Sequence, residues 1–291
     1  MATDEMSLAR LESGLDALEH SEARPPTRAQ RAWLATWPKL AAVGLVLLFW
    51  QVVVWSGWKP KYVLPGPAPV FSRLWKDLVN GDLLDATAVT LRRAFVDFAI
   101  ALVIGTVLGV AVARSRVLRS AIGSMLSGLQ TMPSIAWFPL AILLFQLSER
   151  AILFVVVLGA APSIANGIVA GIDHTPPILL RAGRVLGARG FASLRHVVLP
   201  AALPSFVSGL KQGWAFAWRS LMAGELLVVI GHVQSLGTRL DFARQNADAE
   251  GLLSTMVVIL AIGIVVDALV FGKLELIVRR RYGLVDAASG A

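Results

Sequence analysis

The chain has 291 residues, of which 56% are hydrophobic and only 16% are charged, and it contains no cysteine. Soluble domains carry about a quarter charged residues, so this composition excludes an ordinary soluble enzyme; the lack of cysteine excludes disulfides, iron–sulfur clusters and thiolate zinc sites. The formal net charge of +8 arises from short basic segments between apolar runs, without the basic stripe and interleaved aromatics typical of nucleic-acid binding. We therefore expect a membrane protein with no nucleic-acid partner.

The first 38 residues are polar, and we interpret residues 1–38 as a cytoplasmic N-terminal tail. A cleavable signal peptide would show a short basic start followed quickly by an apolar core, whereas here the apolar run begins only near Leu40. The first membrane span is predicted at Leu40–Trp58. Prolines at positions 65, 67 and 69 then predict a loop followed by an amphipathic helix, because they bar a continuous helix.

Further apolar stretches are long enough to cross a bilayer, which takes about 20 residues. One contains a GxxxG pair, Gly105 and Gly109, a spacing that lets helices approach closely in lipid. Another is predicted to be broken by Pro133 and Pro139. Residues 284–291 form a short C-terminal tail. The sequence thus predicts an all-α, polytopic membrane protein with six spans, the last five at Ala94–Ala113, Val117–Leu147, Ala151–Ile172, Leu203–Ile230 and Leu252–Leu274.

The distribution of Lys and Arg predicts the orientation of the chain. Six spans place both termini on one side, and cytoplasmic loops carry an excess of basic residues. The loops after the second and fourth predicted spans and the C-terminal tail are basic, so we expect both termini in the cytoplasm. The loop after the first span disagrees, because it contains six basic residues: Lys59, Lys61, Arg73, Lys76, Arg92 and Arg93.

Motifs of covalent chemistry are absent from the sequence. The one Gly-Lys pair, Gly272-Lys273, has Asp267 at the position where a phosphate-binding loop needs its first glycine. The histidines, at positions 20, 174, 196 and 232, are too scattered to indicate a metal site. We expect no catalytic residue, no metal and no ATP hydrolysis by this chain alone.

The segment 176–200 carries the most specific pattern. Small residues at 182 and 183 are followed by Gly187, where the chain can turn, and then by an aliphatic residue and Leu-Pro. This spacing resembles the EAA loop of bacterial ATP-binding-cassette importer permeases, although Arg181 stands at the family's Glu and Gly183 at its second Ala. In that family the segment forms two short cytoplasmic helices that dock on the ATPase subunit. The resemblance assigns this role to Arg181, Ala182, Gly183, Arg184, Gly187, Ala188, Leu199 and Pro200.

The resemblance extends over about residues 40–283 and includes LPGPAPVFSRL, TMPSIAWFPLAILLF and APSIANGIVAGI. These segments look like a permease branch that serves sulfonates, taurine and nitrate, with some relatives that carry cations or vitamin precursors. The resemblance therefore implies a type I importer permease domain over residues 39–283, with cytoplasmic coupling helices in the loop 176–200.

The resemblance also implies partners and a location. It implies two ATP-hydrolysing subunits that bind the ATP, a solute-binding protein outside the cell, a second copy of this chain, and a multi-pass position in a bacterial cytoplasmic membrane. This chain itself is expected to bind no cofactor. The expected function is import of a small anionic solute, with an alkanesulfonate as the first candidate and nitrate, taurine or a vitamin or pyrimidine precursor as alternatives.

Ionisable and amide side chains inside the spans are candidates for the translocation path, because they are costly in lipid. Arg219 either attracts an anion or pairs with an acid such as Glu225, and both readings stay open. Asn166 either lines the path or makes an interhelical hydrogen bond, and the second role is favoured. Lys211, near the inner end of its span, is expected to snorkel to water.

Other classes of membrane protein fit the sequence less well. An ion-coupled transporter would show internal repeats and buried acids, of which Glu225 is the clearest here. A membrane-embedded enzyme would need a nucleophile or metal constellation. A purely structural membrane protein leaves the spacing of residues 181–200 unexplained.

Overall fold

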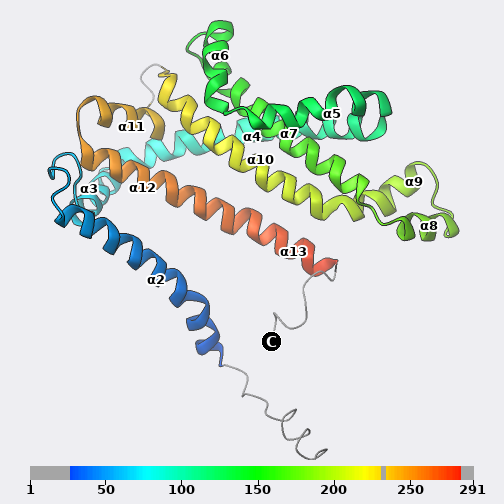
Figure 1. Ribbon diagram of the computed structural model, residues 1–291, viewed down its shortest axis with the longest axis horizontal. Helices are drawn as coiled ribbons and strands as arrows, with labels where there is room; N and C mark the ends of the chain where they lie inside the picture. The colour runs from blue at the N-terminus through cyan, green and yellow to red at the C-terminus, as the bar shows by residue number, and fades with distance from the viewer. Residues whose placement is uncertain (1–26, 231–233, 283–291) are drawn as a thin grey trace, which may run out of the picture. The chain divides into compact units, whose positions relative to one another are not determined.

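A computed structural model of the chain describes residues 27–230 and 234–282, and every regular element in them is a helix (Figure 1). The described residues divide into two units, one that contains residues 27–56 and one that contains residues 57–230 and 234–282. In the described part, five helices are long and apolar enough to cross a membrane, or six if one bent pair counts as a span. The predicted number of spans is therefore reached only with this bent pair.

The first unit contains α2, Arg28–Trp55, of which Thr36–Trp55 is long and apolar enough to span. The helix begins with a capping box, because the side chain of Thr27 accepts from the Gln30 amide and the Gln30 side chain accepts from the Thr27 amide. The helix thus starts well before the predicted span at Leu40. The remainder of the predicted N-terminal tail, residues 1–26, lies outside the described residues.

The second unit is built from long helices joined by short ones. Two of the long runs are continuous through π-helical turns, Phe191–Leu227 and Ala249–Arg281. The elements in chain order are α3 (Pro67–Val79), α4 (Asp82–Arg114), α5 (Arg116–Thr131), η1 (Ser134–Trp137), α6 (Phe138–Phe145), α7 (Glu149–Asp173), α8 (Pro177–Val185), α9 (Phe191–Ser193), η2 (Leu194–Val198), α10 (Leu199–Leu227), α11 (Leu236–Gln245), α12 (Ala249–Val266), η3 (Asp267–Gly272) and α13 (Lys273–Arg281).

The bent pair is the third predicted span. The axes of α5 and of the η1–α6 segment differ by 105°, so the predicted break is confirmed. Pro133 stands between the two segments and ends the first one. Pro139 does not kink a helix: it lies in the first turn of α6, where the missing amide hydrogen costs no helical hydrogen bond.

Helix α7 is the centre of the second unit, packed along α4 on one side and α10 on the other (Figure 1). The contacts are between backbones. A Cβ added to Gly105 would lie 2.7 Å from the Ala161 carbonyl oxygen, and one added to Gly167 would lie 2.7 Å from the Gly209 Cα. The close approach predicted from the GxxxG pair is therefore present, since Gly109 faces Ala165 in the same way.

The alanine variant of Gly167 tests this packing. We expect Gly167→Ala to lower the free energy of unfolding by roughly 1–3 kcal/mol, because the backbone of α10 must move to admit a methyl group. The matched control is Gly123→Ala in α5, where a Cβ would meet nothing within 4 Å. Alanine there gains about 0.5–1 kcal/mol of helix propensity. Thermal unfolding in detergent measures both variants, and equal melting temperatures would contradict the contact.

Candidate functional site

The predicted coupling loop is a hairpin of two helical segments. Helix α8 begins at Pro177 and ends at Val185, and Gly187 follows with a left-handed φ of +84°. The Gly187 amide donates to the Arg184 carbonyl at 3.1 Å, and the Ala188 amide donates to the Gly183 carbonyl at 2.8 Å. These two bonds form a Schellman motif, which stops the helix and reverses the chain. The turn predicted at Gly187 is therefore present.

The second arm of the hairpin is not a separate helix. It begins at Phe191, passes through η2 and continues without a break into α10, with Leu199 and Pro200 in the first turn of that helix. Pro200 follows the π-helical turn directly, and its missing amide hydrogen leaves one carbonyl of that turn without its helical donor. The second arm of the hairpin and the long helix α10 therefore form one helical run, Phe191–Leu227, with no loop between them.

Gly183 joins the two arms. It is buried, and a Cβ there would lie 2.8 Å from Cγ2 of Val197, which belongs to η2. The departure from the family pattern at this position thus has a packing reason, because Val197 occupies the space of the alanine methyl group. Of the predicted coupling residues, Gly183 and Ala188 lie inside the hairpin, whereas Arg181, Ala182 and Arg184 are exposed on it.

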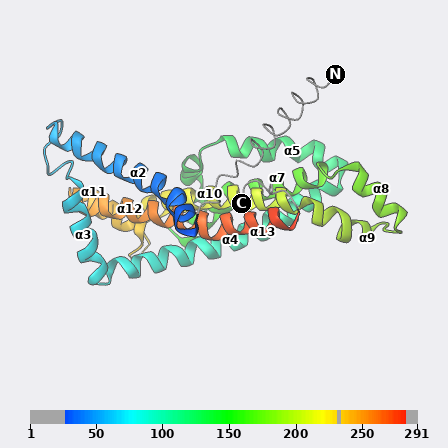
Figure 2. The same cartoon turned by 90° about the horizontal axis from the view of Figure 1, so that it is seen from below.

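The tip of the hairpin is apolar, basic and uncovered. Val185 is 87% exposed, Leu186 is 86% exposed and Phe191 is 70% exposed. Arg181 and Arg184 have no acidic partner within the described residues. The hairpin lies at the end of the second unit opposite to α3 and α11 (Figures 1 and 2). Large apolar side chains held outward on a defined turn are typical of a protein-docking surface.

Glu225, a candidate path residue, lies in a closed network of hydrogen bonds. Its side chain is fully buried and accepts from the Thr90 hydroxyl at 2.9 Å, from Arg93 Nη1 at 3.1 Å and from the Gly237 amide at 3.1 Å. The Thr90 hydroxyl oxygen in turn accepts from the Leu236 amide. One carboxylate therefore connects α4, α10 and the start of α11.

Arg93 extends this network to a fourth helix. Its Nη2 lies 2.6 Å from Oε1 of Glu149, the first residue of α7. Thr90, Arg93 and Glu149 were not among the predicted site residues, and Arg93 was counted as a loop charge. The available signal was Glu225 itself, because a buried carboxylate needs a cationic or hydrogen-bonding partner.

The same kind of pairing involves Arg73, one of the six basic residues of the first loop. Arg73 Nε donates to Asp77 at 3.0 Å, and its Nη2 lies 3.2 Å from Asp248 of α12. Arg239 also pairs with Asp77. Burial lowers the pKa of Arg73, but the hydrogen bond to Asp77 and the charge of Asp248 outweigh it and raise that pKa above its ordinary value. Arg73 and Arg93 of the first loop are thus ion-paired in the structure, and the orientation of the chain stays a prediction.

Arg219 does not pair with Glu225, whose oxygens are occupied by other donors. Arg219 is exposed; its Nε donates to the carbonyl of Ala215 at 2.9 Å, and its guanidinium carbon lies 4.8 Å from the centre of the Phe216 ring. Asn166 is half-buried, and its side chain makes no hydrogen bond with the described residues, so the favoured interhelical bond is not formed within one copy. Lys211 lies 3.4 Å from Asp267, and its side chain remains 40% exposed.

The residues described by the structure contain no group of three His, Cys, Asp or Glu side chains that could hold a metal ion. The described residues form long apolar helices, a hairpin whose turn is fixed by backbone hydrogen bonds, and polar side chains within the spans. These features define a membrane-spanning transport subunit.

Comparison with known proteins gives the family. The chain belongs to the binding-protein-dependent transport system inner membrane components, whose family pattern matches residues 101–280. It is therefore a permease subunit of a binding-protein-dependent ATP-binding-cassette importer, a transport component of the membrane.

Individual relatives of the chain are named for different solutes. The riboflavin transport system permease protein RibX of Chloroflexus aurantiacus is 34% identical, over 78% of this chain and 82% of the relative. The bicarbonate transport system permease protein CmpB of Synechococcus elongatus is 28% identical, over 79% and 85%. SsuC of Bacillus subtilis, named as an aliphatic sulfonates transport permease protein, is 25% identical, over 85% and 87%.

A solved structure confirms the predicted fold. A chain of the inward-facing MetNI methionine ABC transporter superposes with a TM-score of 0.55 at 20% identity, over 68% of this chain and 95% of that chain. This likeness confirms the all-α importer permease fold and carries no information on the solute.

The network around Glu225 predicts that removal of one charge strongly lowers the stability of the protein. We expect Glu225→Gln to lower the free energy of unfolding by roughly 3–5 kcal/mol, because Arg93 then keeps only Glu149 as its counter-ion. The double variant Arg93→Met/Glu225→Gln should lose less than the sum of the two single variants. The matched control is Glu275→Gln, whose side chain is 39% exposed and whose loss should cost less than about 1 kcal/mol. Additive losses in the cycle would contradict the network.

Proposed function

We propose that the hairpin 176–200 is the surface on which the ATP-hydrolysing subunit docks, and that it transmits the ATPase cycle to α10. The observation that carries this proposal is the exposed apolar tip on a turn fixed by the Schellman motif. Because the second arm is continuous with α10, closure of the ATPase pair would move a membrane-spanning helix without an intervening joint.

The wider assembly follows from this docking. A second copy of the chain would complete the translocation path, a solute-binding protein would deliver the cargo outside, and both termini would lie in the cytoplasm. ATP would be bound and hydrolysed on the partner subunit, and this chain would perform no chemistry. Transport is then a shift between inward-open and outward-open states that ATP and the loaded receptor both bias.

The proposed cargo is a small anion, with an alkanesulfonate first. Arg219 supports an anion, since it is exposed and has no acidic partner among the described residues. Two of the three relatives above are named for anions, a sulfonate and bicarbonate, and the third for riboflavin. Nitrate, taurine and vitamin or pyrimidine precursors are the alternative cargoes; an ion-coupled transporter is the alternative mechanism.

Docking of the ATPase subunit is tested by placing a charged side chain at the apolar tip of the hairpin. Leu186→Glu should reduce co-purification of the ATPase subunit at least tenfold, because it places a charge in the apolar contact. The control is Val79→Glu in α3, which is also exposed (67%) but lies at the opposite end of the second unit. Full retention of the ATPase by Leu186→Glu, or equal loss in both variants, would refute the docking site.

The cargo is tested by growth of a strain that lacks the gene. We expect failure with an alkanesulfonate as the sole sulfur source, rescue by the intact gene, and normal growth on sulfate. Taurine as sulfur source and nitrate as nitrogen source separate the alternatives. Normal growth on all of these would discard the sulfonate assignment and leave the importer assignment unchanged.

A further inference from the structure

Helix α10 has a face of small and polar side chains that no other described element of the second unit covers. In the middle of the helix the exposed residues are Ser208, Gln212, Ala215 and Arg219. Their spacing of four, three and four positions places them on one side of a helix. We call these four residues the α10 stripe, which is roughly 16 Å long at about 1.5 Å per residue.

The rest of α10 is accounted for by its neighbours. Gly209 and Gly213 face α7, where a Cβ on either would contact Gly167 or Ile164. Trp214 and Trp218 are buried in the main apolar core of the second unit, and Lys211 pairs with η3. The stripe is therefore distinct from the faces of α10 that pack on α7 and η3, and only Ser208, at its end, borders α13.

The α10 stripe is unsuited to lipid. A guanidinium group and a primary amide that face hydrocarbon lose their hydrogen bonds to water, which is costly. Large apolar side chains are exposed on other spans of the same unit, for example Val107 (64% exposed) on α4 and Leu260 (65% exposed) on α12. The exposed positions on α4 and α12 therefore suit contact with lipid, whereas the α10 stripe suits contact with water.

Arg219 gives the stripe a net positive charge. Its Nε is bonded to its own helix, and its other two nitrogens have no partner among the described residues. The fixed orientation over the Phe216 ring leaves that two-nitrogen edge free. Such an edge binds an oxyanion with two parallel hydrogen bonds.

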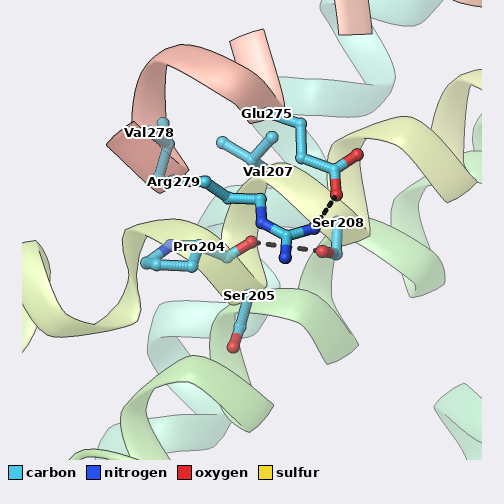
Figure 3. A pocket seen from close by; sticks show the side chains of 7 residues that line it. All are labelled: Pro204, Ser205, Val207, Ser208, Glu275, Val278 and Arg279. Carbon is cyan, nitrogen blue, oxygen red and sulfur yellow. Dashed lines mark hydrogen bonds and ion pairs between the residues drawn. The ribbon is translucent and has the colours of Figure 1, made fainter. Parts of the chain in front are cut away.

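The inner end of the stripe opens into a cavity of about 350 Å³ between α10 and α13 (Figure 3). Ser208 belongs to both the stripe and the cavity, and Ser205 lines the cavity beside it. The cation of the cavity, Arg279, lies 3.7 Å from Glu275, so its charge is balanced. The unbalanced charge along this route is that of Arg219.

We propose that the α10 stripe lines the aqueous path for the cargo, and that Arg219 selects an anionic solute while Gln212 and Ser208 supply neutral hydrogen bonds toward the inner cavity. This inference rests on the proposed importer function and adds the surface and the residue that recognise the charge of the cargo.

Accessibility to water is the first test, and the absence of native cysteine makes it direct. Single cysteines replace Gln212 and Ala215, with Val107→Cys and Leu260→Cys as controls. The complex with its ATPase subunits is placed in liposomes, with and without ATP, and treated with charged methanethiosulfonate reagents. The thiolate is the reactive species, and apolar surroundings disfavour it, so a cysteine that faces lipid reacts slowly. We expect the stripe cysteines to react at least tenfold faster than the controls, and equal rates would overturn the proposal.

Charge selection is the second test. At Ala215→Cys, the ratio of the rates with an anionic (sulfonatoethyl) and a cationic (trimethylammonioethyl) reagent should fall on the order of tenfold when Arg219→Gln is added. Arg219→Lys should keep the ratio. An unchanged ratio of the two rates in Arg219→Gln would contradict the proposal that Arg219 selects an anionic solute.

These results are separable from the proposed function. Co-purification of the ATPase subunit is measured in the same preparations, and its retention shows that the variants are folded. If the unaltered chain failed to bind the ATPase subunit, the proposed function would fail, whereas labelling of the full chain alone in liposomes would still report whether the stripe faces water.

Discussion

The second unit depends on the contact of the α7 backbone with the backbones of α4 and α10. At Gly105, Gly109, Gly167 and Gly209 there is no side chain to hold the helices apart, and a single methyl group would meet backbone atoms at 2.7–2.9 Å. Burial of apolar surface contributes little to helix association inside a lipid bilayer, where the tails are as apolar as the side chains. Close van der Waals contact is therefore a main source of attraction, and the glycine positions fix one register for the three helices.

The network around Glu225 adds an electrostatic constraint at the end of these helices that is farthest from the hairpin. A carboxylate with no exposed surface is stable only with its partners, and here the partners come from α4, α11 and, through Arg93, α7. The ion pairs and hydrogen bonds of Glu225 therefore join α4, α7 and α10 at one end. The glycine contacts join the same three helices along their length. In the proposed importer, this body receives the motion of the hairpin, because the second arm of the hairpin is continuous with α10.

Two surfaces of this body are uncovered, and their chemistry is opposite. The hairpin tip presents Val185, Leu186 and Phe191 outside the long helices, where water would otherwise meet apolar side chains. The α10 stripe presents Gln212 and Arg219 within a span, where lipid would otherwise meet polar ones. In an isolated copy of the chain, each surface would therefore contact a solvent that does not suit its side chains. This property is expected of a subunit that works only in a larger assembly.

The linear sequence by itself determined the elements that depend on local composition. Runs of apolar residues predicted the spans, Pro133 predicted the break, and Gly187 with the spacing up to Pro200 predicted the hairpin and the family. Local patterns were less exact at helix ends: α2 begins at Arg28 because of a capping box that the polarity of the tail concealed.

Only the tertiary structure decided which charges are paired. The donors to Glu225 come from Thr90, Arg93 and Gly237, which are 135, 132 and 12 positions away in the chain, and nothing in the local sequence links them. The same packing sets the rotation of α10, which leaves Arg219 outward and without an acid while Glu225 on the same helix is buried. A side chain's partner depends on which helix faces it, so its role is decided by helix packing and cannot be read from its position in a span.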